Sequence, residues 1–177
     1  MTENEISRHL VAAALEVHRT LGGPGLLESV YEEALCYELL QRGLHVQRQL
    51  EVPIVYKGCH LATPLRLDLL VEGKVVVEVK ATTQYQPIYE AQALTYLRLL
   101  DLRLALVINF GERRLKDGLV RVVNIDKIRA EKGLPGAWLD VAGALGLLAL
   151  GLFLARRVRE TGEVTLAAVV GRFYGPR

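Results

Sequence analysis

The sequence is poor in cysteine, and its beginning shows no secretory leader. Only two of the 177 residues are cysteines, Cys36 and Cys59, and they form no CxxC pair and have no histidine cluster beside them. A disulfide framework and a cysteine-ligated zinc site are therefore not expected. The N-terminal stretch MTENEISRHL contains acids and no apolar core, so it does not look like a secretory signal. Both features predict reduced thiols in a cytoplasmic protein.

The sequence also lacks a strong charge of one sign. The net charge is +2, and with 51% apolar and 24% charged residues the composition is that of a globular chain. Residues 1–40 hold seven acidic and two basic residues, whereas residues 41–132 hold ten acidic and fifteen basic ones. The second segment could present a basic face to a polyanion, but an ordinary solvated surface explains the same pattern.

Hydrophobic periodicity predicts an α/β domain over residues 1–132. The GGPG run at 22–25 ends the first helix, and Pro53 places part of the first strand at a sheet edge or a bulge. An order of two helices, three strands, a helix and two strands predicts a mixed β-sheet flanked by helices. The apolar spacing indicates helices over 5–21, 27–41 and 88–100, and strands over 46–56, 65–71, 75–80, 104–110 and 119–125.

The C-terminal part of the chain, residues 133–177, differs in character from this domain. A linker-like GLPG sequence at 133–136 is followed by an uncharged apolar stretch at 141–155. Within the possible tether at 137–157, residues 137–155 come close to the about 20 apolar residues that a membrane helix needs, although Asp140 lies among them and Arg156 and Arg157 follow. An extra hydrophobic helix is therefore expected here. It could be a membrane tether, a helix docked on the domain or on a partner, or a tail without a function.

Three charged residues on two neighbouring apolar strands form the main candidate site. Side chains two apart on a strand share a face of the sheet. Glu78 and Lys80 therefore point together, while Val77 and Val79 point into the opposite layer. Asp68, on the preceding strand, has to reach the face of Glu78 and Lys80 if the carboxylates are to share a metal ion.

The length of the turn between the two strands decides where Asp68 points. In an antiparallel hairpin, directly opposed residues share a face. A two-residue turn would put Asp68 and Glu78 on opposite faces, whereas a three-residue turn over 72–74 opposes them directly. Three-residue turns need a residue with a left-handed backbone, which Gly73 can supply. We predict this turn, or an equivalent bulge.

Two carboxylates in one half-buried site favour a bound divalent cation. Asp68 and Glu78 would repel each other, and a cation between them would remove that penalty. Mg²⁺ prefers one or two carboxylates together with water and phosphate oxygens, and Mn²⁺ could take its place. Lys80 could orient an attacking water or neutralise charge that develops on a phosphate. A salt bridge on a solvated strand is the alternative interpretation of these residues.

Together with two further patterns, these residues resemble a known protein family. The motifs in question are GxxExxY (Gly25, Glu28, Tyr31), the core of Asp68, Glu78 and Lys80, and the pair Gln92 and Tyr96. In this order and over about residues 3–126, they are similar to the GxxExxY proteins, a family of the PD-(D/E)xK nuclease superfamily. The GGPG loop at 22–25 departs from the family pattern by one additional glycine, and the tail has no counterpart in it.

The resemblance implies a restriction-endonuclease-like fold and a Mg²⁺-dependent site. It also implies residue roles, which the positions of the motifs carry over to this chain. The implied roles are metal ligand for Asp68 and Glu78, catalytic lysine for Lys80, accessory acid for Glu28, and positioning of DNA or of the lysine for Gln92 and Tyr96.

The expected function is Mg²⁺-dependent hydrolysis of DNA, rather than RNA, by an activated water. A polar loop with Arg113, Arg114 and Lys116 is the candidate contact to nucleic acid. One alternative is a non-catalytic module that keeps the fold and binds nucleic acid or protein. Another is a membrane-tethered protein whose tail sets its location. The resemblance also suggests a homodimer. Strandedness of the substrate and endonuclease or exonuclease action stay open at this level.

Overall fold

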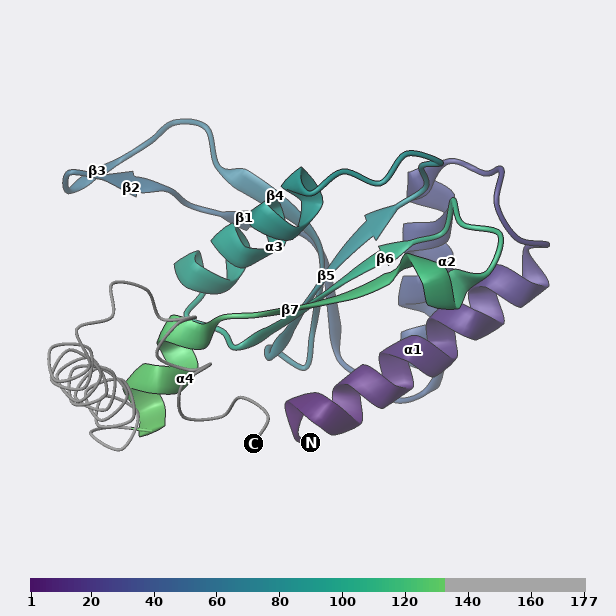
Figure 1. The fold of residues 1–177 in the computed structure, drawn as a ribbon. Coiled ribbons are helices and arrows are strands. Elements are labelled where there is room, and N and C mark those ends of the chain that lie inside the picture. The colour runs from purple at the N-terminus through teal and green to yellow at the C-terminus, as the bar shows by residue number, and fades with distance from the viewer. Residues whose placement is uncertain (133–177) are drawn as a thin grey trace, which may run out of the picture. The chain divides into compact units, whose positions relative to one another are not determined.

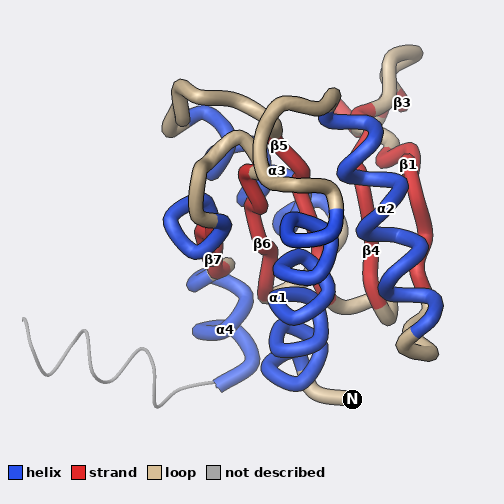
Figure 2. The backbone as a smooth tube through the Cα atoms, turned by 90° about the vertical axis from the view of Figure 1, so that its right-hand side faces the viewer, coloured by secondary structure: helices blue, strands red, loops and turns tan. Residues whose placement is uncertain are grey.

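The computed structural model describes residues 1–132, and these form a five-stranded mixed sheet with helices on both faces. Figures 1 and 2 show α1 and α2 on one face and α3 on the other. The expectation of a restriction-endonuclease-like mixed α/β sheet is confirmed. The elements of the main body are α1 (Glu3–Thr20), α2 (Glu28–Gln41), β1 (Val46–Val52), β4 (Leu65–Val71), β5 (Val75–Lys80), α3 (Ile88–Leu99), β6 (Leu104–Asn109), η1 (Leu115–Gly118), β7 (Leu119–Val123) and α4 (Ile125–Lys132).

The strand order of the sheet is β1-β4-β5-β6-β7. The pair β5 and β6 is parallel, and the other neighbouring pairs are antiparallel. A parallel pair needs a crossover connection, and α3 provides it between β5 and β6. Because β4 runs antiparallel to β5, the beginning of β4 and the end of β5 lie at the same end of the strands. The candidate site lies near this end.

Two apolar clusters lie on opposite faces of the sheet. The α1/α2 cluster contains Ile6, Leu10 and Val17 of α1 and the alternate residues Val75, Val77 and Val79 of β5. The α3 cluster takes Val76 from β5 and packs it against Ala93 and Leu97 of α3. The alternation along β5 therefore directs Glu78 and Lys80 to the α3 side. That the two share a face follows from their spacing, as expected.

The turn between β4 and β5 has the predicted length. Val71 pairs with Val75 and Leu70 with Val76, which leaves three residues in the loop. Glu72 and Gly73 both have a left-handed backbone, with φ of 54° and 63°. The left-handed conformation expected at Gly73 is present, and its neighbour Glu72 shares it.

The strand expected over 46–56 is wrong in its second half. β1 ends at Val52, directly before Pro53, which has no N–H to donate to the sheet. Val55–Tyr56 forms β2 and pairs with β3 (Cys59–His60) in a separate two-stranded sheet. A turn at Lys57 and Gly58 joins these strands, with φ of 50° and 84°. Figure 1 shows this hairpin extending away from the main sheet.

A short helix, α4, was not expected from the sequence. The strand predicted over 119–125 ends at Val123 as β7, and α4 begins at Ile125. Asn124 lies between them, and its side-chain oxygen accepts a hydrogen bond from the Lys127 backbone N–H at 3.2 Å. Asn124 therefore caps the new helix. Within residues 1–132, no helix is both long and apolar enough to cross a membrane. The hydrophobic helix predicted over 137–157 lies outside the described residues.

Candidate active site at the end of strand β5

Asp68 lies where β4 separates from β5. The regular pairing of the two strands ends at Leu69 and Val77. Beyond that point, the Asp68 carboxylate accepts a hydrogen bond from the Val79 backbone N–H at 2.8 Å. On the other side of β4, the residue opposite Asp68 is Gln49, whose φ of 53° is left-handed. Asp68 thus lies at a local irregularity of the sheet, and its side chain replaces a backbone acceptor.

Glu78 is almost completely buried, and only one of its oxygens has a partner. Its side chain is 1% exposed. Oε2 lies 3.1 Å from Lys80 Nζ, whereas Oε1 is buried without any hydrogen-bond donor. Burial, and then the charge of Asp68, raise the pKa of the Glu78 carboxyl to about 7. A buried carboxylate oxygen without a donor is costly, so this oxygen is an open ligand position.

Lys80 joins three carboxylates at one point. Its Nζ lies 3.1 Å from Glu78, 3.7 Å from Glu28 and 4.0 Å from Asp68. Burial alone would lower the pKa of this lysine, but the charges of Glu78, Asp68 and Glu28 outweigh it and raise that pKa. Lys80 therefore stays protonated. Asp68, Glu78 and Lys80, which were expected to meet, thus come together at the Lys80 ammonium.

Glu28 enters the site from the first turn of α2, and Tyr31 holds the loop before it. The Tyr31 hydroxyl donates to the Gly23 carbonyl at 2.7 Å and accepts from the Leu26 N–H at 3.1 Å. Its ring stacks on Phe110 with a centroid distance of 4.7 Å. The glutamate and the tyrosine of the GxxExxY pattern thus act together, since one carries the charge and the other fixes the loop that leads to it.

Gln92 and Tyr96 lie on one face of α3, as their spacing predicts, and they contact each other. Gln92 Nε2 donates to the Tyr96 hydroxyl at 3.3 Å. The Tyr96 hydroxyl donates in turn to the Arg66 carbonyl at 2.7 Å. This bond ties α3 to β4 two residues before Asp68. Burial raises the pKa of the Tyr96 hydroxyl, so it remains a donor at neutral pH.

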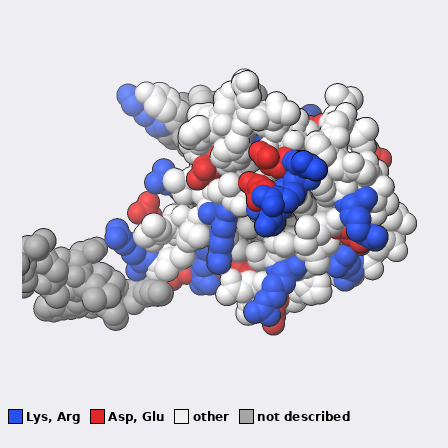
Figure 3. All heavy atoms as spheres, turned by 45° about the vertical axis from the view of Figure 1, so that its right-hand side comes forward, with Lys and Arg blue, Asp and Glu red and all other residues white. Residues whose placement is uncertain are grey.

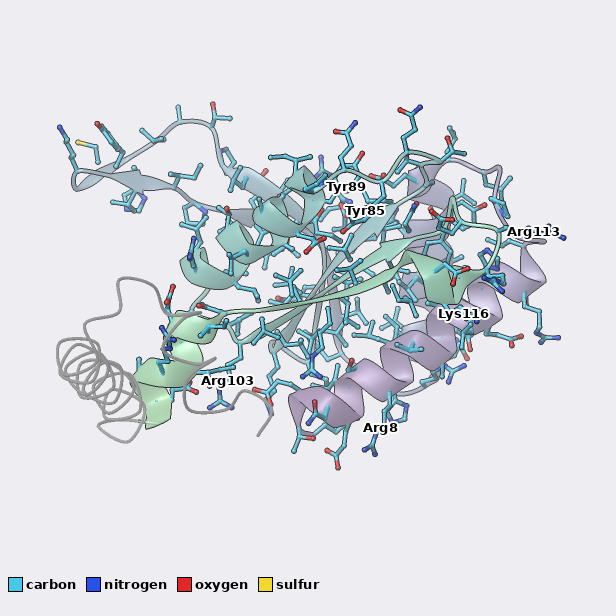
Figure 4. All side chains as sticks on the ribbon, in the orientation of Figure 1. Arg8, Tyr85, Tyr89, Arg103, Arg113 and Lys116 are labelled. Carbon is cyan, nitrogen blue, oxygen red and sulfur yellow. The ribbon has the colours of Figure 1, made fainter. Side chains whose placement is uncertain are left out.

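Arg113, Arg114 and Lys116 lie in the segment between β6 and β7, on the protein surface. All three are exposed, and Arg114 pairs with Asp117 at 2.8 Å. Figure 4 shows Arg113 and Lys116 near η1, on the α1 side of the molecule. In Figure 3, Lys and Arg side chains form several separate groups among acidic ones on the face shown, so the basic surface is divided.

The segment that follows Lys80 is held by a buried asparagine that the sequence analysis missed. Asn109, at the end of β6, accepts from the Thr82 N–H at 3.0 Å and donates to the Thr82 carbonyl at 2.8 Å. A Cβ at Gly111 would lie 2.3 Å from the Thr82 carbonyl oxygen, so this approach needs glycine. The sequence signal for Asn109 was its position as a polar residue at the end of an apolar strand.

Glu32 is a second buried acid, one turn after Glu28, and sequence reasoning assigned it no role. It accepts from Arg48 Nε at 2.7 Å and from Gln49 Nε2 at 2.6 Å, so both of its oxygens have donors. Because Gln49 stands opposite Asp68, this cluster supports the irregularity at which Asp68 lies. Its spacing of four from Glu28 on a helix was the only sequence signal.

Two tyrosines at the start of α3 were also missed. Tyr85 and Tyr89 meet edge to face, with ring centroids 5.5 Å apart and planes at 78°. Lys80 Nζ lies 5.5 Å from the centre of the Tyr89 ring. Figure 4 shows both side chains near the N-terminal end of α3. Aromatic residues near a helix start carry no distinctive sequence pattern, which explains why they were overlooked.

The donor set fits a magnesium ion only with help from water or substrate. The residues that the structure describes contain no group of three or more His, Cys, Asp or Glu side chains able to hold a metal ion. Asp68 and Glu78 supply two carboxylates, and the unpartnered Glu78 Oε1 is the kind of oxygen that a hard cation takes. Mg²⁺ usually combines one or two carboxylates with water and phosphate oxygens, so these residues suit it.

The fold and the site define a class of protein with a nuclease-like α/β core. The comparison with known families agrees. Residues 4–122 match the PD-(D/E)XK nuclease superfamily, and the chain belongs to that superfamily. No curated protein and no solved structure gives a significant match. The narrower likeness to the GxxExxY proteins stays a prediction.

Proposed function

We propose that this protein hydrolyses phosphodiester bonds of DNA in a reaction that requires Mg²⁺ or Mn²⁺. The observation that carries the proposal is the Glu78 carboxylate, which is buried beside Asp68 and Lys80 with one oxygen lacking a donor. A stable fold gains nothing from such an oxygen. A site that receives a cation explains it, and superfamily membership supports the same chemistry.

Asp68 and Glu78 are the residues that would hold the ion. When bound there, Mg²⁺ would supply positive charge for the phosphate oxygens and make a nearby water more acidic. Asp68 is fixed for this role by its bond from the Val79 N–H. Since that bond uses Oδ2, the Oδ1 atom remains for the ion.

Lys80 and Glu28 would act on the substrate and the attacking water. The protonated Lys80 can donate to a phosphate oxygen, or hold a water in line with the phosphorus, and so stabilise the charge that develops there. Glu28 is half exposed and lies 3.7 Å from Lys80. It can accept a proton from that water or orient it, which is the role of an accessory acid.

Other residues would position the substrate rather than react. Tyr96 and Gln92 hold the strand that carries Asp68, so they act as positioning residues. Arg113, Arg114 and Lys116 would contact backbone phosphates outside the reacting bond. Replacing Arg113 and Arg114 by Ala should weaken DNA binding and make its salt dependence shallower, by about one phosphate contact per arginine. An unchanged salt slope would place this loop away from DNA.

A cleavage assay tests the proposal. Purified full-length protein is incubated with labelled single-stranded and duplex DNA in Mg²⁺, in Mn²⁺ and in EDTA. We expect Asp68→Ala and Lys80→Ala to reduce the rate by about 10³-fold. Lys74→Ala is the matched control, because it removes an exposed lysine at the opposite end of β5. Cleavage that survives both site substitutions would refute the proposed function.

A non-catalytic role is the second candidate, and one observation favours it. Lys80 already lies within 4.0 Å of all three carboxylates, so it offsets part of their charge without any metal. Under this alternative the chain keeps the nuclease fold and binds nucleic acid or a protein. Calorimetric titration with Mg²⁺ separates the two, because a nuclease should take up the ion at Asp68 and Glu78. A binding module need not take up Mg²⁺.

A further inference from the structure

A pair of aromatic rings lies beside the candidate active site. Tyr85 belongs to the segment after β5, and Tyr89 to the first turn of α3. Both are partly exposed, and their immediate neighbours Gln84, Gln86 and Ile88 are exposed. The rings therefore pack on the α3 cluster and remain partly exposed to solvent.

The rings lie within one nucleotide of the groups that would bind the reacting phosphate. Lys80 Nζ is 5.5 Å from the centre of Tyr89, and the same nitrogen is 3.1 Å from Glu78. In a nucleic acid, a phosphate and its base are separated by a single sugar. A phosphate at Lys80 would therefore bring a neighbouring base to the level of the tyrosines.

We propose that Tyr85 and Tyr89 form a stacking platform for an unstacked base of single-stranded DNA next to the reacting phosphate. This inference rests on the proposed function, because it assumes that the phosphate lies at Lys80. Within a duplex both faces of a base are covered by its neighbours. An aromatic platform therefore favours single strands and frayed ends.

The neighbours of the two rings agree with such a platform. The edge-to-face packing holds each ring in a defined orientation. The Tyr85 hydroxyl lies 3.4 Å from Glu90, which restrains the ring from the exposed side. No base-specific donor is required, since every base has an aromatic face. The platform should therefore accept all four bases with similar affinity.

Binding measurements with two DNA forms test this inference. Fluorescein-labelled oligothymidylate and a blunt hairpin duplex are titrated with full-length protein in Ca²⁺, and anisotropy is recorded. We expect Tyr89→Ala and Tyr85→Ala each to weaken single-strand binding by about 5- to 100-fold, with little change for the duplex. Tyr89→Phe keeps the ring and should bind like the wild type. Tyr37→Ala removes an exposed tyrosine of α2 and is the second control.

A second measurement needs no substitution. An oligonucleotide with 5-iodouracil is photo-crosslinked to the wild-type protein, and the modified peptide is identified by mass spectrometry. A crosslink at Tyr85 or Tyr89 supports the platform. Crosslinks exclusively elsewhere, or equal losses for single strand and duplex in the alanine variants, would overturn it.

The outcomes separate this inference from the proposed function. If the protein cleaves no DNA but its single-strand binding still depends on the two rings, the nuclease proposal fails and the platform stands. If cleavage depends on Asp68 and Lys80 but the ring variants bind and cleave like the wild type, the platform fails and the nuclease stands.

Discussion

Two buried glutamates in this fold have opposite hydrogen-bonding states. Glu32 is 5% exposed, and both of its oxygens accept short bonds, from Arg48 and Gln49. Glu78 is 1% exposed, and one of its oxygens has no donor. The first arrangement stabilises the fold, since every polar atom is satisfied. The second is stable only because the rest of the fold holds it in place, and it leaves an oxygen available for a ligand.

The largest expected effect contrasts the two residues in catalysis. Glu78→Gln removes the negative charge that would hold the cation, so the cleavage rate should fall by about 10²- to 10³-fold. Glu32→Gln leaves Asp68, Glu78 and Lys80 unchanged and acts on the site only through the fold, so it should change the rate only by a few-fold. Initial rates at saturating Mg²⁺ compare the two variants. A similar loss in both would show that the two acids do not differ in role.

The pH dependence of stability gives the next largest effect. The folded pKa of Glu78 is raised from 4.5 to about 7. Below pH 4.5 the acid is protonated in both states and costs nothing. As pH rises towards 7, only the unfolded state loses its proton, so the free energy of unfolding should fall by about 3 kcal/mol.

Urea unfolding in EDTA at pH 5 and pH 8 measures this fall. Burial also raises the pKa of Asp68, which adds a change of the same sign. Glu78→Gln should remove most of the slope, and it should therefore stabilise the metal-free protein at pH 8. If the free energy of unfolding of Glu78→Gln fell between pH 5 and pH 8 as much as that of the wild type, the Glu78 carboxylate would not be the group that causes the fall.

A smaller effect is expected on the stability contributed by Glu32. Glu32→Gln removes the negative charge that pairs with Arg48 and replaces one acceptor oxygen by an amide donor. Arg48 is partly exposed and can regain water, which limits the loss. We expect the free energy of unfolding to drop by about 1–3 kcal/mol. Equal stability of wild type and variant in urea at pH 7 would contradict a structural role.

The smallest expected effect concerns Tyr96. Tyr96→Phe removes the hydroxyl bond to the Arg66 carbonyl while it keeps the ring in the core. The free energy of unfolding should fall by about 1 kcal/mol. If Tyr96 positions Asp68, the rate should fall as well, with KM nearly unchanged. A loss of stability without any change in rate would limit Tyr96 to the fold.

The register of the central hairpin could be predicted because it depends on local chemistry. The number of residues between β4 and β5, and a glycine able to take a left-handed turn, determine that Val71 opposes Val75. The alternation along β5 then places Glu78 and Lys80 on one face. Because these features depend only on residues close together in the chain, they can be predicted from the sequence.

The supports of the site depend on residues far apart in the chain. The bond from Gln49 to Glu32 crosses from β1 to α2, and that from Asn109 to the Thr82 carbonyl joins the end of β6 to the segment after β5. No spacing rule connects such positions. For α4 a local signal was present, because Asn124 is a good capping residue. The strand predicted over 119–125 nevertheless ran two residues past the observed end of β7 and so covered the start of the helix.

The bond between Asp68 and the Val79 N–H has a consequence for descendants of this chain. Because Asp68 serves as an acceptor for the neighbouring strand, its loss would leave a buried amide proton unpaired, in addition to removing a ligand of the proposed ion. A lineage without the proposed nuclease activity would therefore still be under selection for an oxygen at this position. Asparagine is the substitution that should accumulate there, since its carbonyl can take over the hydrogen bond while the charge is lost.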